Sequence, residues 1–185
     1  MTHETERVLL LDDSLHICGT EDKARVHTRH TPLHLAFSCY IFNDAGALLL
    51  TRRALGKQAW PGVWTNSVCG HPLPGESMQD AVERRCRQEL GLEVHNLREI
   101  DPDFCYRATD ASGIVENEFC PVFFAYSALQ PQPNPDEVMD YSWVTVANAL
   151  AGVRAIPAAF SPWMGLQLQR PAILSALCQR ESDEA

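Results

Sequence analysis

Residues 63–91 limit the possible folds more than any other stretch, because an apolar segment there leads through a glycine and a short loop into an amphipathic helix. The sequence VWTNSVCG is apolar and β-branched in alternation, which predicts a strand ending at Gly70. The sequence ESMQDAVERRCRQELG predicts a helix that ends at Gly91. One face of this helix carries the apolar residues Val82, Cys86 and Leu90. We therefore expect a strand, a loop and a helix in direct succession.

Further strands and helices are predicted on both sides of this unit. HLAFSCYIFNDAGALLLTRR predicts two strands joined by the turn NDAG, which together form a hairpin. RVLLLDD, GIVENEFCPVFFAY and YSWVTV each predict one strand, and SPWMGLQLQRPAILSAL predicts helix with a break at Pro171. QRESDEA predicts a frayed, solvated end. No linker interrupts the pattern, so we expect one domain over residues 1–185.

Composition narrows the range of partners. The 185 residues carry a formal net charge of −9, which disfavours nucleic acid as a partner. No apolar run reaches the length of a membrane-spanning helix, and the N-terminus lacks the pattern of a signal peptide. Seven cysteines without a CxxC pair are typical of reduced thiols. We therefore expect a cytoplasmic protein without membrane insertion, as a monomer or homodimer that acts on a small molecule.

Two pairs of polar residues are spaced to present both members on one face of a strand. Cys69 and His71 form one pair, and Glu116 and Glu118 form the other. The glutamates could simply mark the solvent face of a half-exposed sheet. However, the flanking residues in IVENEFCPVFF are apolar, which favours a polar cavity in which a metal or a proton transfer compensates their burial.

Histidines occur near the same strands. His27 and His34 lie before and at the start of the strand HLAFSCYIF, and His71 follows the strand that carries Cys69. A single histidine is more often a surface residue or a satisfied core residue. Three histidines and two glutamates together provide nitrogen and oxygen ligands for Zn²⁺, Mn²⁺ or Mg²⁺. Spacing alone leaves open whether the five side chains converge.

The helix region also contains a recognisable motif. Gly70, Glu76 and Arg84 are separated by five and seven residues, and this spacing resembles the Nudix box, with further matches at Glu89, Gly91 and Leu92. Such a loop and helix direct carboxylates at metal ions on a diphosphate. Arg85 and Gln88 stand where the box has glutamates. These two replacements favour binding of a diphosphate over its hydrolysis. The resemblance to the Nudix box implies an α/β (α+β) fold with a Nudix-like mixed β-sheet core between helices.

Segments outside the box extend the resemblance to residues 7–170. TRRALGKQAWPGVWTNSVCGHP, YRATDASGIVENEFCPVF, DEVMDYSWV and FSPWM resemble the type 1 isopentenyl-diphosphate Δ-isomerases. The resemblance implies interconversion of isopentenyl diphosphate and dimethylallyl diphosphate, an allylic and homoallylic pair in isoprenoid biosynthesis. It implies a metal site of His27, His34, His71, Glu116 and Glu118.

The same resemblance implies the remaining roles. Cys69 and Glu118 would be the catalytic pair, and Glu89 would hold Mg²⁺ on the diphosphate. The phosphate oxygens would contact Lys23, Arg53, Lys57 and Arg85. Tyr106 and Trp163 would complete the pocket over the hydrocarbon.

The reaction explains why these residue types are needed. Moving a double bond by one carbon requires an acid that protonates the alkene and a base that removes a proton from the neighbouring carbon. A free thiol has a pKa of about 8.5, so Cys69 is expected to be mostly protonated at neutral pH. Trp163 could stabilise a carbocation through its ring, although a core aromatic is the simpler explanation of SPWMGLQ by itself. Which of Cys69 and Glu118 is the acid in each direction stays open.

Two other functions are consistent with parts of the sequence. A Nudix hydrolase that cleaves a diphosphate would share the box, but Arg85 and Gln88 replace two of its carboxylates. A non-catalytic metal-binding or ligand-binding protein would also share the fold, but it would leave the pairing of Cys69 with Glu118 without a purpose.

Overall fold

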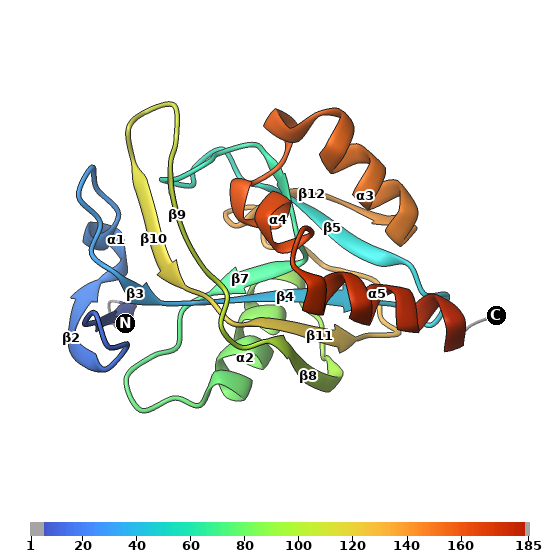
Figure 1. Cartoon of the computed structure of the whole chain (residues 1–185), viewed down its shortest axis with the longest axis horizontal. Helices are drawn as coiled ribbons and strands as arrows, with labels where there is room; N and C mark the ends of the chain where they lie inside the picture. The colour runs from blue at the N-terminus through green and yellow to red at the C-terminus, as the bar shows by residue number, and fades with distance from the viewer. Residues whose placement is uncertain (1–5, 184–185) are drawn as a thin grey trace.

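A computed structural model describes residues 6–183, with side chains described up to residue 180. Two sheets form its centre (Figure 1). The smaller sheet has the strand order β2-β1-β3-β10-β9. Its strands are β1 Arg7–Leu11, β2 Ile17–Asp22, β3 His34–Leu35, β9 Cys105–Thr109 and β10 Val115–Phe119.

The larger sheet has the order β12-β5-β4-β11-β8, with β6 paired to β5 and β7 paired to β4. Its strands are β4 Phe37–Phe42, β5 Leu48–Arg53, β6 Trp64–Thr65, β7 Val68–Gly70, β8 His95–Asp101, β11 Val122–Tyr126 and β12 Val138–Val144. The helices are α1 Lys23–Val26, α2 Met78–Leu90, α3 Val146–Ala155, η1 Pro157–Ala159, α4 Pro162–Gln167 and α5 Pro171–Asp183.

Helices cover both faces of the larger sheet (Figure 1). Phe37 and Ile41 of β4 belong to one buried cluster, which also contains Val82, Cys86 and Leu90 of α2. Tyr40 and Phe42 alternate with them and belong to the other cluster, which contains residues of α3, α4 and α5. A strand buried on both faces is apolar throughout rather than alternating. The predicted mixed-sheet core between helices is therefore confirmed.

Local signals explain α2. The Ser77 side chain accepts a hydrogen bond from the Asp80 backbone N–H at its N-terminus, and Gly91 ends it with φ of 62°. Its predicted apolar residues Val82, Cys86 and Leu90 are fully buried. The predicted helix and its apolar face are confirmed.

Three predicted strands are each divided in the structure. HLAFSCYIF forms β3 in the smaller sheet and β4 in the larger one. VWTNSVCG forms β6 and β7, because the side chains of the intervening Asn66 and Ser67 hydrogen-bond to backbone groups of neighbouring strands. GIVENEFCPVFFAY forms β10 and β11, which lie in different sheets. The break falls at Cys120 and Pro121, where proline has no N–H to donate to a ladder. This break takes the chain from the smaller sheet to the larger one.

The sequence signals missed β2, α1, β8 and β9, which are short or rich in polar residues, and they also missed the apolar helix α3. The frayed end predicted at 179–185 is wrong as far as residue 183, because α5 continues to Asp183 and Arg180 is buried against the rings of Phe42 and Tyr126. Residues 184–185 lie outside the described part. Within residues 6–183, every helix is too short or too polar to cross a membrane.

Candidate active site

A cavity of about 400 Å³ lies among the N-terminal segment, the smaller sheet, the loop after β5 and the start of α4. Eleven of the thirteen predicted site residues line it: Lys23, His27, Arg53, Lys57, Cys69, His71, Arg85, Tyr106, Glu116, Glu118 and Trp163. His34 and Glu89 lie behind its wall, where His34 contacts Glu118 and Glu89 contacts Arg85. Residues far apart in the sequence therefore converge on one space.

Strand register builds the histidine and glutamate cluster. Glu118 of β10 lies opposite His34 in the parallel pairing with β3, and opposite Tyr106 in the antiparallel pairing with β9. Glu118 Oε1 lies 3.4 Å from His34 Nε2 and 3.1 Å from His71 Nε2. One ligand atom from each of His27, His34, His71 and Glu118 falls within 4.8 Å of the others. Glu116 joins this cluster through His27, at 3.1 Å between Oε2 and Nε2.

Several polar atoms of the cluster are buried without a hydrogen-bond partner in the described structure. They are His27 Nε2, His34 Nε2, His71 Nδ1 and Glu116 Oε2. Buried polar atoms are normally paired, and each exception needs an explanation such as an ion. The His34 ring is oriented by a 2.9 Å contact between Nδ1 and the Pro32 carbonyl, which leaves Nε2 as the free ligand atom. The donor set therefore fits a divalent metal ion.

Burial sets the protonation of the cluster. Burial lowers the pKa of His71 to about 3, so its ring is neutral and keeps a lone pair for a metal. Burial and the charge of Glu118 raise the pKa of Glu116. Burial alone would raise the pKa of Glu118, but the His34 and His71 rings beside its carboxylate hold this pKa well below its usual range. The surroundings thus move the pKa values of these two glutamates in opposite directions, although the residues lie only two positions apart.

Cys69 lies in a buried polar network that the sequence signals missed. Its thiol contacts Asn66 Oδ1 at 3.3 Å and Ser38 Oγ at 3.4 Å. The Asn66 amide is fixed because its NH₂ group donates to the carbonyls of Cys39 and Val68. Its oxygen therefore faces the thiol as an acceptor. Burial raises the pKa of Cys69 to about 11, so this group is a neutral thiol at physiological pH.

Aromatic rings form the wall beside this thiol. Trp163 donates its indole N–H to Asn66 Oδ1 at 3.1 Å, so the same amide positions both the thiol and the ring. The ring centroid lies 5.8 Å from that of Tyr106 and 5.7 Å from that of Trp60. Tyr106 donates its hydroxyl to Glu118 Oε2 at 2.9 Å. An indole ring and a hydrogen-bonded carboxylate therefore face the same cavity.

The spacing of the motif has a structural explanation at three positions. Arg84 donates two hydrogen bonds to the Glu76 carboxylate, at 2.7 and 2.8 Å, and one to the carbonyl of His71. This arrangement ties the start of the loop to α2 and orients the backbone beside a cluster histidine. A Cβ atom on Gly70 would lie 2.7 Å from the Arg85 side chain, so a residue with a side chain cannot occupy this position without a shift.

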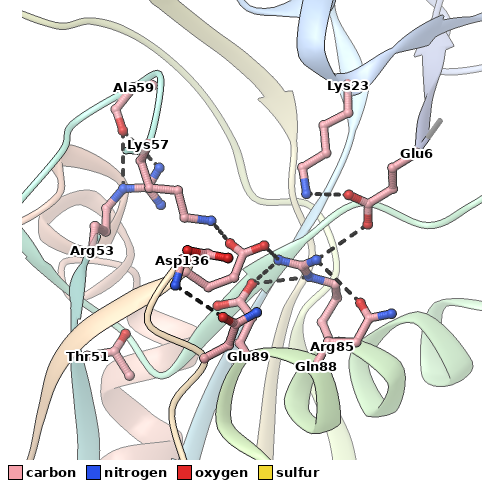
Figure 2. Close-up of polar contacts among 12 residues, drawn as sticks. Glu6, Lys23, Thr51, Arg53, Lys57, Ala59, Arg85, Gln88, Glu89 and Asp136 are labelled. Atoms are coloured by element: carbon pink, nitrogen blue, oxygen red, sulfur yellow. Dashed lines mark hydrogen bonds and ion pairs between the residues drawn. The ribbon is translucent and has the colours of Figure 1, made fainter. Parts of the chain in front are cut away.

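The other end of the cavity contains paired charges (Figure 2). Lys23 Nζ lies 2.6 Å from Glu6 Oε2, and Glu6 Oε1 lies 3.4 Å from Arg85 Nη1. Arg85 also pairs with Glu89 one helical turn away. Glu137 completes the group through its contacts with Lys57 and Arg85. Arg53 differs, because it donates to the carbonyls of Ala59 and Trp60 and lies over the Trp163 ring.

Sequence reasoning missed Glu6, Glu137 and Asn66. Glu6 precedes the first strand and Glu137 lies in a proline-rich loop, so neither position has a periodic pattern that points to a cavity. Asn66 had a usable signal, because an adjacent Asn and Ser interrupt the apolar run VWTNSVCG. A polar residue inside a buried strand needs internal hydrogen-bond partners.

Comparison with solved structures supports the fold. DR0079 from Deinococcus radiodurans aligns with a TM-score of 0.63 at 22% identity, over 81% of this chain and 90% of that chain. A MutT protein from Methanosarcina mazei aligns with a TM-score of 0.57 at 21% identity, over 83% of this chain and 95% of that chain. At such identities the likeness concerns the fold alone.

Sequence comparison identifies the family. Residues 32–164 match the model of the NUDIX domain. An isopentenyl-diphosphate Delta-isomerase of Kocuria rhizophila is 56% identical over 93% of this chain and 96% of its own length. A protein of the same name from Escherichia coli is 60% identical over 89% of this chain and 90% of its own length. The chain therefore carries a NUDIX domain and belongs to the isopentenyl-diphosphate Delta-isomerase family.

Proposed function

We propose that this isomerase interconverts isopentenyl diphosphate and dimethylallyl diphosphate by proton addition to the alkene and proton removal from the neighbouring carbon. The observation that carries the proposal is that Cys69 and Glu118 line one cavity beside the histidine cluster. A neutral thiol and an ionised carboxylate provide one proton donor and one proton acceptor. The names of relatives at 55–60% identity support the same reaction.

The histidine and glutamate cluster would hold one divalent ion. Its ligands would be His27, His34, His71, Glu116 and Glu118. When bound, such an ion supplies positive charge that compensates the burial of the two glutamates. Tyr106 donates its hydroxyl to the second oxygen of Glu118 and so orients this carboxylate for proton transfer.

The thiol and the rings would act on the hydrocarbon. In one direction the Cys69 thiol delivers a proton to the alkene and becomes a thiolate. In the other direction the thiolate removes a proton from the carbocation and becomes a thiol, and Asn66 holds the sulfur in place. Protonation creates a tertiary carbocation, which water would capture. The Trp163 ring is buried beside the thiol and stabilises this cation by roughly 0.5 to 2 kcal/mol.

The diphosphate would lie at the charged end of the cavity. Lys23, Arg53 and Lys57 line this end and would contact phosphate oxygens, together with Arg85. Glu89 would hold Mg²⁺ on the diphosphate, and its present contact with Arg85 would then be exchanged for the ion. The thiol chemistry requires a reduced Cys69, which suits the proposed cytoplasmic location.

A proton NMR time course in deuterated water tests the reaction. The purified protein is incubated with isopentenyl diphosphate and Mg²⁺. We expect dimethylallyl diphosphate that carries deuterium from the solvent. Release of inorganic phosphate or pyrophosphate would instead support a hydrolase, and an unchanged spectrum with the metal site filled would support a non-catalytic binding protein.

A further inference from the structure

Three of the four predicted phosphate-binding cations are already paired with carboxylates inside the protein. Lys23 contacts Glu6, and Lys57 contacts Glu137. Arg85 contacts Glu6 and Glu89 (Figure 2). It also contacts Glu137. The site therefore contains carboxylates, which repel a phosphate anion, next to the cations that attract it.

The charged end of the cavity carries only a small net positive charge. The four cations Lys23, Arg53, Lys57 and Arg85 face the three carboxylates Glu6, Glu89 and Glu137, which leaves one net positive charge. Arg84 also contacts Glu6, but it does not alter this balance because the charge of its second partner, Glu76, offsets its own. Asp136 also lines the cavity, but it is exposed and screened by solvent.

A diphosphate monoester carries about three negative charges at neutral pH, and binding one Mg²⁺ reduces this to about one. The free anion would therefore leave an excess of negative charge in a partly buried site, which is costly. The magnesium complex would leave the site near neutrality. Removing one carboxylate should thus favour the free anion far more than the magnesium complex.

We propose that Glu137 is a specificity determinant that makes this site select the magnesium complex of a diphosphate over the free anion, with Glu6 as a weaker contributor. The inference rests on the proposed function, because it assumes a diphosphate at this end of the cavity. Glu137 bridges two cations with its two oxygens, at 3.2 Å to Arg85 Nη2 and in contact with Lys57 Nζ. Its side chain is 21% exposed, compared with 30% for Glu6, so its charge is less screened.

Calorimetric titration with inorganic pyrophosphate tests this selectivity, in the presence of Mg²⁺ and separately with a chelator. We expect Glu137→Gln to tighten binding of metal-free pyrophosphate by about tenfold, and to change binding of magnesium pyrophosphate by less than about threefold. Glu6→Gln should shift the ratio in the same direction by a smaller factor. The matched control is Glu83→Gln on the outer face of α2, which removes the same charge and should leave the ratio unchanged.

Three outcomes would overturn the inference. The ratio of the two affinities could stay at the wild-type value in Glu137→Gln, both affinities could change equally, or Glu83→Gln could shift the ratio as much. If any one of these outcomes occurs while the wild-type protein isomerises isopentenyl diphosphate, the inference about Glu137 fails and the proposed function stands. If the wild-type protein neither binds pyrophosphate in either form nor isomerises the substrate, the proposed function fails as well.

Discussion

The two ends of the cavity satisfy their polar groups in opposite ways. At the cluster of His27, His34, His71, Glu116 and Glu118, several buried ligand atoms have no hydrogen-bond partner among residues 6–183. At the charged end, Lys23, Lys57 and Arg85 are each paired with a carboxylate of the chain itself. The first arrangement is incomplete without a cation, whereas the second is complete and must exchange partners when an anion binds. A bound cation should therefore stabilise the first end. A bound anion should compete with the carboxylates of the chain at the second end.

Loss of Glu118 should have the largest effect, because it removes a metal ligand and a proton-transfer group together. We expect Glu118→Gln to lower kcat by about 10⁴-fold and metal affinity by about 10- to 100-fold. Metal content and the NMR assay measure the two effects. Glu99→Gln, at an exposed position of β8, is the control. Full metal occupancy with wild-type activity in Glu118→Gln would remove the basis for the proposed base.

Loss of the thiol should separate chemistry from metal binding. We expect Cys69→Ala to lower kcat by about 10²- to 10⁴-fold while the protein stays folded and keeps its metal. The exposed Cys105→Ala should be neutral. A Cys69→Ala variant that retains near wild-type kcat would show that another group protonates the alkene.

At the charged end, pH should affect binding through Lys57. Burial lowers the pKa of Lys57 to about 8, so this cation loses its proton as the pH rises past that value. We expect kcat/KM to fall above about pH 8, by up to about tenfold per pH unit, through a rise in KM. Lys57→Arg keeps the charge and should move the decline to higher pH. An identical pH profile in the Arg variant would assign the decline to a different group.

The smallest effect is expected at Arg84, which contacts both ends of the site. It donates to the His71 carbonyl on the metal side and lies 3.3 Å from Glu6 on the charged side. We expect Arg84→Met to lower the free energy of unfolding by about 1 kcal/mol, measured by urea denaturation. The exposed Arg87→Met on the same helix should cost less. Equal losses in the two variants would argue against a supporting role for Arg84.

Local patterns in the sequence were sufficient to predict the elements whose contacts lie within one short segment. The periodicity of 76–91 and the glycine at 91 predict α2, and the turn NDAG predicts the hairpin of β4 and β5. The spacing of Glu116 and Glu118 predicts their common direction, and both line the cavity. These predictions succeed because caps, turns and side-chain alternation depend on residues that are neighbours in the chain.

The tertiary structure alone decided how these pieces meet. The parallel pairing of β3 with β10 places Glu118 opposite His34, and the break at Pro121 sends the chain to the second sheet. Packing also brings Glu6 and Glu137 onto Arg85, from segments without a periodic pattern. Motifs in the sequence determined which chemical groups are present and which family the chain belongs to. Their distances, charge balance and pKa values depend on burial and on partners far apart in the chain, which only folding brings together.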